Sequence, residues 1–474
     1  MRRTKIIGTI GPASESKEIL RKLFIWGMDI VRLNMSHGDH AYHRDIIKKV
    51  RELEKELGKP IAILIDLQGP RIRTGKLITD TVLLKRGKTI TITSNDVVGN
   101  SERFSTNYKN LSKDVKRGDK ILLDNGFIEL KVLKVSGKDV SCRVVDGGEL
   151  GEHKGINLPG IKLSTSTLTK KDRKDLSFAI REKVDYIAIS FVRSPEDVQE
   201  VKKIIKKRRT DISLIAKIEK PEAVKNIDKI IDVSDGIMIA RGDLGVEMPA
   251  EAVPVIQKDI IEKCNRRGKI VITATQMLES MLDRMRPTRA EASDVANAVF
   301  DGTDALMLSE EVAVGKYPVK TVETMSRIAE EAEKTIIKGK NVIEMLELNG
   351  HEVASAVGHA AASLAEDLNA SAVVTFTSSG YTALLVSKYR PDAPVYTMTT
   401  SIVTARKTCL FWGTKPVIVG KYKSTDEMFK LAEKILLKMK IVEKGDIILT
   451  IAGVPIGKPG TTNLIKIQRA GEHL

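Results

Sequence analysis

Cysteine and aromatic residues are scarce in this sequence, and long apolar runs are absent. The three cysteines (Cys142, Cys264 and Cys409) lie far apart without ligand spacing, so we expect neither a disulfide framework nor a zinc site. Aromatic residues make up only 4% and do not interleave with the basic runs, which disfavours a nucleic-acid partner. No run approaches membrane-spanning length, and glycine and proline break the N-terminal apolar run too early for a signal peptide. We therefore expect a cytoplasmic protein without a membrane partner.

Positive charge is in surplus. Lys and Arg outnumber Asp and Glu by 78 to 62, a net charge of +16, which favours anionic partners. The densest basic run, KKIIKKRR at 202–209, has the pattern of a solvated helix face. Small phosphorylated substrates suit this surplus as well as nucleic acid does. A length of 474 residues predicts several domains, each large enough to bury a core.

The segment 213–248 places charged groups just after two apolar strands. ISLIAKI and DGIMIA have strand length, and the stretch between them begins with a proline and carries apolar residues at helical spacing. In such a βαβ unit the C-terminal ends of both strands lie on one side of the sheet. Lys217, Glu219 and Asp243 fall at those ends. The fragment alone fits a divalent-metal site beside a cation and a structural ion pair equally well.

Strand–helix alternation extends over most of the chain. Three parallel-type strands precede residue 71 and five follow residue 168, so they number eight, as in a closed (β/α)8 TIM-type barrel. An open doubly wound sheet is the alternative. We predict an α/β protein with barrel segments 1–70 and 169–335, a helical stretch around 318–347, and two further domains. Residues 71–168 alternate with period two and predict a small inserted all-β lid, and residues 336–474 predict an open α/β sheet.

The C-terminal domain carries one candidate anion site. TFTSSGYTA places hydroxyls and free amides between a strand and a helix. An effector site and an ordinary capped turn both fit this pattern. The residues concerned are Thr375, Thr377, Ser378, Ser379, Gly380 and Thr382.

Many motifs, taken in order, resemble the pyruvate kinase family over essentially the whole chain. They include KIIGTIGPAS, IVRLNMSHG, LIDLQGPRIRTG, AKIEKPEAV, IMIARGDLGVEMP, TATQMLESM, RPTRAEASDVANAVFDGTDALMLS and the closing GVPIGKPGTTNLIKI. The resemblance implies a glycolytic phosphotransferase that converts phosphoenolpyruvate and ADP to pyruvate and ATP. A metal-dependent pyruvate or enolate lyase on a similar barrel is the enzymatic alternative, and a basic nucleic-acid-binding protein is the alternative of another class.

The resemblance also implies roles for individual residues. Glu219 and Asp243 are expected to hold Mg²⁺ or Mn²⁺, and Lys217 to stabilise the transferring group and the enolate. Arg32 and Arg73 are expected to face phosphates. The substrate carboxylate is assigned to the backbone of Ala240, Arg241, Gly242 and Asp243, and proton transfer to Thr275 with Ser309 and Glu311 behind it.

The remaining assignments concern the nucleotide and a monovalent cation. The nucleotide contacts expected from the resemblance are Pro12, Asn34, His37, Arg73 and Lys171. Family members that require K⁺ bind it near Asn34, Ser36, Asp66 and Leu67, with a glutamate where this chain has Arg71. Because a guanidinium supplies positive charge itself, we predict activity without K⁺.

Two further expectations come from the family. Its members usually form homotetramers, and Arg289 is expected near a subunit contact, while allosteric control through the C-terminal domain is expected without an identified effector. Glu310 stands in LSEEV where many members have LSGET, which adds a charge beside the expected proton relay.

Overall fold

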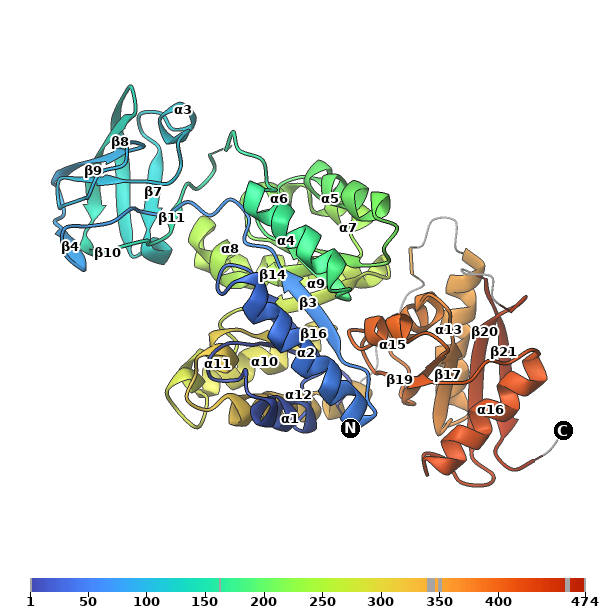
Figure 1. The fold of residues 1–474 in the computed structure, drawn as a ribbon. Coiled ribbons are helices and arrows are strands. Elements are labelled where there is room, and N and C mark those ends of the chain that lie inside the picture. Colours follow the sequence, from blue (N-terminus) through green and yellow to red (C-terminus); the bar gives the residue numbers. More distant parts are fainter. Residues whose placement is uncertain (1, 162, 339–345, 348–351, 457–460, 473–474) are drawn as a thin grey trace.

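Eight parallel strands close into a barrel in the computed structural model, which describes residues 2–161, 163–338, 346–347, 352–456 and 461–472 (Figure 1). The strand order around the barrel is β1-β16-β15-β14-β13-β12-β3-β2, so the predicted barrel is confirmed and the open-sheet alternative is wrong. The strands are β1 (Lys5–Thr9), β2 (Ile30–Asn34), β3 (Ala62–Asp66), β12 (Tyr186–Ile189), β13 (Ser213–Ile218), β14 (Gly236–Ala240), β15 (Ile270–Ala274) and β16 (Ala305–Leu308).

The strands are almost entirely buried, and amphipathic helices surround them. Continuous apolar runs such as IVITA in β15 suit strands that are covered on both faces. Several helices begin at a side-chain cap. Thr169 forms a capping box with Asp172 at the start of α4. The surrounding helices are α1 (Lys17–Ile25), α2 (His40–Leu57), α4 (Lys170–Arg181), α5 (Pro195–Lys207), α6 (Pro221–Lys225), α7 (Ile227–Val233), α8 (Arg241–Glu247), α9 (Val253–Arg266), α10 (Arg289–Asp301), α11 (Glu310–Ala313) and α12 (Pro318–Lys338).

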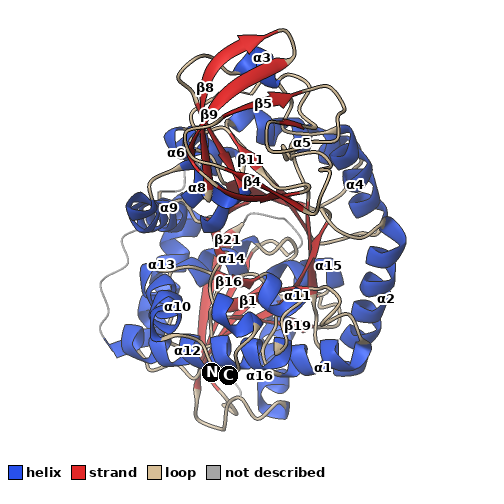
Figure 2. Ribbon diagram, turned by 90° about the vertical axis from the view of Figure 1, so that its left-hand side faces the viewer, coloured by secondary structure: helices blue, strands red, loops and turns tan. Residues whose placement is uncertain are grey.

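An all-β lid follows β3 and stands beside the barrel mouth (Figure 2). It contains a six-stranded sheet of order β11-β7-β8-β9-β5-β6 and a two-stranded sheet of β10 and β4. Its own apolar core, which includes Ile92, Phe104 and Leu130, is separate from the barrel core. The elements are β4 (Thr81–Leu84), β5 (Thr89–Thr93), β6 (Arg103–Ser105), α3 (Leu111–Asp114), β7 (Lys120–Leu123), η1 (Asp124–Gly126), β8 (Ile128–Ser136), β9 (Asp139–Asp146), β10 (Gly148–Gly151) and β11 (Ile156–Asn157).

The C-terminal domain is an open five-stranded sheet of order β19-β18-β17-β20-β21, parallel except for the last pair. It lies on the side of the barrel away from the lid (Figure 1). Its elements are α13 (Glu352–Asp367), β17 (Ala372–Phe376), α14 (Tyr381–Lys388), β18 (Val395–Thr399), α15 (Ile402–Thr408), β19 (Thr414–Ile418), α16 (Thr425–Lys438), β20 (Ile447–Gly453) and β21 (Thr462–Arg469).

The C-terminal domain closes the floor of the barrel. Leu410 and Phe411, just after α15, belong to one buried apolar cluster with barrel residues such as Ile7 and Met307. The hydroxyl of Tyr186, at the start of β12, donates to the carbonyl of Lys407 at 2.5 Å. The barrel interior is therefore continuous with this domain rather than capped by the barrel's own loops.

Two expected segments lie partly outside the described residues. They are 339–345 of the helical stretch expected around 318–347, and 457–460 of the closing family motif. No helix in the part of the chain that the structure describes has the length and apolar character needed to cross a membrane.

Candidate active site

Lys217 is the centre of a buried charged cluster at the C-terminal ends of the barrel strands. Its ammonium group lies 2.7 Å from Glu219 Oε1 and 3.3 Å from Asp66 Oδ1. Asp66 in turn pairs with Arg32 at 2.7 Å, and Arg32 also donates to Thr9 Oγ1 at 2.8 Å. β2, β3 and the end of β13 thus bring four charged groups together, and the sequence analysis places two of them, Lys217 and Glu219, at a strand end.

Opposite charges in this cluster favour the ionised forms of Lys217 and Asp66. Burial lowers the pKa of Lys217, but Asp66 and Glu219 outweigh it, so the net pKa is raised. Burial likewise opposes ionisation of Asp66, while Lys217 and Arg32 bring its pKa below the ordinary value. Lys217 and Arg32 thus place two positive charges at the rim of the barrel, which favours an anionic substrate.

Ser190 belongs to the same cluster, and the sequence analysis missed it. Its hydroxyl accepts from Lys217 Nζ at 2.8 Å and donates to the carbonyl of Leu67 at 2.7 Å. The position after a buried strand was the available signal, but a serine there is common in turns and carries no charge to attract notice.

Glu219 and Asp243 fit a divalent metal. Glu219 is fully buried and accepts from the backbone N–H of Phe191 at 2.6 Å. Burial raises its pKa, Lys217 opposes that rise and the charge of Asp243 adds to it, so a divalent cation would relieve the repulsion. Among the described residues no three acidic, histidine or cysteine side chains form a metal-binding group. Two carboxylates suit Mg²⁺, which keeps waters and substrate phosphates in its other positions.

The first turn of α8 lies beside Thr275. Ala240 precedes the helix, and Gly242 N–H donates to Thr275 Oγ1 at 2.7 Å. Thr275 has a left-handed backbone, with φ of 69°, and its hydroxyl donates to the carbonyl of Ala274 at 2.5 Å. Arg241 pairs with Asp294 at 2.7 Å, and its guanidinium also donates to the carbonyl of Thr275 at 2.9 Å. The helix start and the threonine are therefore held as one unit.

The expected proton relay has no direct hydrogen-bonded path. Glu311 is buried and accepts from the backbone N–H groups of Ser309 and Leu278, at 2.7 and 3.3 Å, and burial raises its pKa. Ser309 Oγ is buried without a hydrogen-bond partner among the described atoms. Within the described chain no hydrogen bond joins Thr275 to Ser309 or Glu311, so a relay between them requires water or substrate. Glu310 is exposed.

The arginines at the base of the lid face different groups. Arg73 donates to the carbonyl of His153 in the lid at 2.8 Å, and burial together with the charge of Arg71 lowers the pKa of Arg73. Arg71 Nη2 lies 3.8 Å from Asp243 Oδ1. Arg71 is therefore close to the candidate metal carboxylate and forms only a long ion pair with it.

The predicted nucleotide residues lie around the rim. Pro12 and His37 are exposed in the loops after β1 and β2, and the carbonyl of His37 accepts from His43 Nε2 at 2.8 Å. Lys171 on α4 pairs with Asp175 at 2.6 Å and donates to the carbonyl of Met35 at 2.5 Å. Pro12 and His37 thus lie in loops that border the mouth and Lys171 lies in the first turn of α4, but these three described residues do not form one hydrogen-bonded group.

The predicted monovalent-cation residues are already engaged with protein groups. Asn34 Oδ1 accepts from the backbone N–H of Ser36 at 3.0 Å. The carbonyl of Leu67 accepts from Ser190, and Asp66 pairs with Arg32 and Lys217. A cation at this position has to compete with two buried cationic side chains for Asp66.

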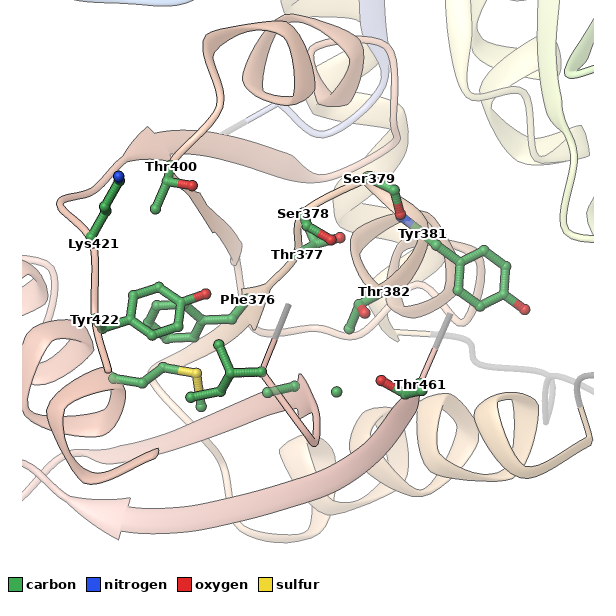
Figure 3. Close-up of a pocket in the computed structure, with 14 residues that line it drawn as sticks. Phe376, Thr377, Ser378, Ser379, Tyr381, Thr382, Thr400, Lys421, Tyr422 and Thr461 are labelled. Atoms are coloured by element: carbon green, nitrogen blue, oxygen red, sulfur yellow. The ribbon is translucent and has the colours of Figure 1, made fainter. Parts of the chain in front are cut away.

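The C-terminal segment TFTSSGYTA opens onto a cavity of about 230 Å³ (Figure 3). Thr377, Ser378, Ser379 and Thr382 line it together with Lys421 on the opposite side. Thr375 is instead fully buried in β17, where its hydroxyl donates to Thr397 Oγ1 of the neighbouring strand β18 at 3.2 Å, and it does not line the cavity. Gly380 N–H donates to Thr377 Oγ1 at 2.9 Å, so this segment is a capped turn as well as a cavity wall.

Comparisons with known proteins agree with the geometry. The family model described as pyruvate kinase, barrel domain, matches residues 1–322, and that described as pyruvate kinase, alpha/beta domain, matches residues 355–468. Pyruvate kinases from Staphylococcus aureus and Staphylococcus saprophyticus are each 47% identical, over 100% of this chain and 81% of the relative. The crystal structure of a pyruvate kinase from Cryptosporidium parvum has a TM-score of 0.90 and 38% identity, and the match covers 99% of this chain and 96% of that one. The lyase alternative has no support among these relatives. The chain belongs to the pyruvate kinase family.

Proposed function

We propose that this chain transfers the phosphoryl group of phosphoenolpyruvate to ADP and then protonates the enolate to pyruvate. The observation that carries the proposal is the buried ammonium group of Lys217 between Glu219 and Asp66, beside Arg32. Phosphoryl transfer depends mainly on positioned cations that neutralise charge spread over phosphate oxygens. The cations at the rim, together with a metal ion held by the carboxylates of Glu219 and Asp243, would supply such neutralisation.

The chain's own residues provide binding and orientation. Glu219 and Asp243 would hold Mg²⁺ or Mn²⁺, which supplies Lewis-acid neutralisation of the phosphate oxygens. Lys217 donates to the oxygen that becomes the enolate, and Arg32 and Arg73 hold phosphate oxygens. The backbone at the start of α8, Ala240 to Asp243, receives the substrate carboxylate, because a helix N-terminus favours an anion.

Thr275 acts near the enolate carbon in this proposal. A threonine hydroxyl is a weak acid, so it orients a water molecule or passes on a proton. Its hydrogen bonds to Gly242 and Ala274 fix the direction of the hydroxyl. Ser309, just after β16, and Glu311, in α11, act through water, since neither has a direct hydrogen bond to Thr275 in the described chain.

Nucleotide binding falls to Pro12, Asn34, His37, Arg73 and Lys171 in this proposal. Activity does not require K⁺, since the guanidinium of Arg71 contributes a fixed positive charge near Asp243. Asn34, Ser36, Asp66 and Leu67 then serve as protein contacts rather than as K⁺ ligands.

We further propose a cytoplasmic homotetramer with a regulatory cavity in the C-terminal domain. Thr377, Ser378, Ser379, Thr382 and Lys421 give that cavity hydroxyl donors and one cation, which suit a phosphorylated effector. Light scattering of the purified protein tests the tetramer, and titration with sugar phosphates and nucleoside monophosphates tests the cavity.

The test of the main proposal is pyruvate formation from phosphoenolpyruvate and ADP with Mg²⁺, with K⁺, with Na⁺ and with neither. Equal turnover in all three supports both the reaction and the role of Arg71. Turnover only with K⁺ retains the reaction and removes that role. A folded sample that binds Mg²⁺ and shows no turnover refutes the proposal.

A further inference from the structure

Glu247, the last residue of α8, joins three elements through one carboxylate oxygen. Its Oε1 pairs with Lys220 Nζ at 2.5 Å and accepts from Asn157 Nδ2 at 2.9 Å. Lys220 follows Glu219 directly, whereas Asn157 lies in the lid strand β11. The barrel rim and the lid are therefore tied to the same atom.

This contact is buried, which makes it costly to disturb. The side chain of Glu247 is 1% exposed and that of Lys220 is 9% exposed. The second oxygen, Glu247 Oε2, has no hydrogen-bond partner in the described part of the chain. Only two donors, Lys220 and Asn157, therefore stabilise the buried carboxylate of Glu247 in the described part of the chain. Loss of either donor is expected to weaken the contact between the lid and the rim.

The cationic side of the contact extends to the candidate metal ligand. Lys220 Nζ lies 5.9 Å from the ring centroid of Phe191, a cation–π distance. The backbone N–H of Phe191, which has a left-handed φ of 56°, donates to Glu219 Oε2. The order of contacts is thus Glu247, Lys220, Phe191 and Glu219.

Helix α8 connects this contact to Asp243, the second candidate metal ligand. α8 carries Asp243 in its first turn and Glu247 at its end. The lid turn also packs on this helix, since a methyl group placed on Gly126 would lie 3.7 Å from the Val246 side chain. A small cavity lined by Arg71, Asn157, Lys220 and Asp243 remains between the lid and the rim.

We infer that Glu247 is a positioning residue that couples closure of the lid to the placement of Glu219 and Asp243. Closure brings Asn157 onto Glu247 Oε1, and the same oxygen holds Lys220, whose neighbours carry the two carboxylates. The kinetic part of this inference rests on the proposed function, whereas the structural part does not.

The experiment compares Asn157→Ala and Asn157→Asp with Asn95→Ala and Asn95→Asp, since Asn95 is an exposed asparagine of the same lid. Backbone hydrogen exchange is measured on the ligand-free protein without metal. We expect the rate of backbone exchange over 154–158 to rise about tenfold in Asn157→Ala, because this variant loses a hydrogen bond to a charged acceptor. The rate is expected to rise further in Asn157→Asp, because the new carboxylate and that of Glu247 repel each other. The Asn95 variants are expected to exchange like the parent.

A second variant separates coupling from simple lid loosening. Glu247→Gln keeps the size of the side chain but removes the charge that holds both donors, so exchange is expected to rise over 154–158 and 241–248 together.

The kinetic arm measures kcat/KM for phosphoenolpyruvate. It is expected to fall about tenfold in Asn157→Ala, as loss of about 1.4 kcal/mol requires.

Two results overturn the inference. One is exchange in the Asn157 variants that matches the Asn95 variants. The other is a lower melting temperature with unchanged kcat and KM, which would give the contact a merely structural role. Absence of turnover in the parent protein would refute the proposed function instead, and the exchange measurements would still decide whether the contact exists.

Discussion

Lys388 Nζ, at the end of helix α14, lies 2.5 Å from Asp304 Oδ2 just before barrel strand β16, and both side chains are fully buried. Asp304 Oδ2 also accepts from the backbone N–H of Val271 at 2.8 Å. Burial lowers the pKa of Lys388, although Asp304 opposes that effect. A buried ion pair thus joins the C-terminal domain to the floor of the barrel.

Lys388→Met should therefore destabilise the protein by about 3–5 kcal/mol, since it leaves a buried carboxylate without its main cation. The free energy of unfolding in urea measures this. Lys334→Met, in an exposed pair with Glu331 whose side chains are 68% and 76% exposed, is the control and should cost less than about 1 kcal/mol. Equal effects of the two substitutions would contradict the prediction.

Lys217→Gln should lower kcat by about 10²-fold or more, because it removes a charge aimed at oxygens that gain charge in the transition state. The measurement is steady-state turnover with saturating Mg²⁺, accompanied by the melting temperature to show that the variant is folded. Lys22→Gln on the outer helix α1, where Lys22 is 49% exposed, is the matched control. A folded Lys217→Gln variant with the parent's kcat would remove Lys217 from the mechanism.

Arg71→Glu should make turnover depend on K⁺. The substitution places a carboxylate where Arg71 now lies 3.8 Å from Asp243, so the fixed positive charge is lost and negative charge accumulates. We expect turnover without K⁺ to fall about tenfold or more and to recover when K⁺ is added. Arg71→Lys keeps the charge and should stay independent of K⁺. Equal turnover of Arg71→Glu with and without K⁺ would argue against the role of Arg71.

Asp29 should contribute to acid stability. Burial opposes its ionisation, but Arg2 at 2.7 Å and the nearby Lys5 and Lys59 prevail and lower the pKa of Asp29 from 3.8 to about 2. Since the folded chain binds this proton at lower pH than the unfolded chain, the stabilisation is present above about pH 4 and is lost as pH falls toward 2. Its size is about 2 kcal/mol, because one pKa unit corresponds to about 1.4 kcal/mol.

The comparison is Asp29→Asn against the parent in urea unfolding at pH 7, 4 and 3. The variant should be less stable at pH 7, and the gap should narrow as the pH falls. A gap that stays constant down to pH 3 would show that Asp29 does not titrate as described. Asp283→Asn, where Asp283 is 73% exposed, provides a control with little expected effect.

The rim was predictable because parallel strands place their C-terminal ends on one side. Once Lys217, Glu219 and Asp243 were assigned to strand ends, their meeting followed from topology alone. The count of eight strand–helix units favoured the closed barrel but left an open sheet as the alternative, because closure depends on pairing between the first and last strands. Ser190 and Glu247 were not predictable in this way, since their partners come from other strands and from the lid, and no local pattern indicates which partner a side chain meets.

Two other features show the same limit. Thr375 and Thr377 are close in sequence and both belong to the candidate anion segment, yet Thr375 is buried within β17 and bonds to the neighbouring strand, whereas Thr377 lines the cavity. The exact end of β17 decides this, and strand ends are poorly defined by sequence. The burial of Leu410 and Phe411 against the barrel interior joins segments far apart in the chain, which sequence periodicity cannot reveal.

Because Leu410 and Phe411 close the barrel floor, the two ends of the barrel should differ in how well they tolerate the gain or loss of a domain. At the mouth, a whole β domain has been accommodated between consecutive strands with a core of its own. At the floor, the barrel shares its interior apolar cluster with another domain. A chain truncated after α12 would therefore expose the apolar residues at the floor of the barrel and be prone to aggregation. Deletion of the lid, in contrast, would leave the barrel's apolar interior covered.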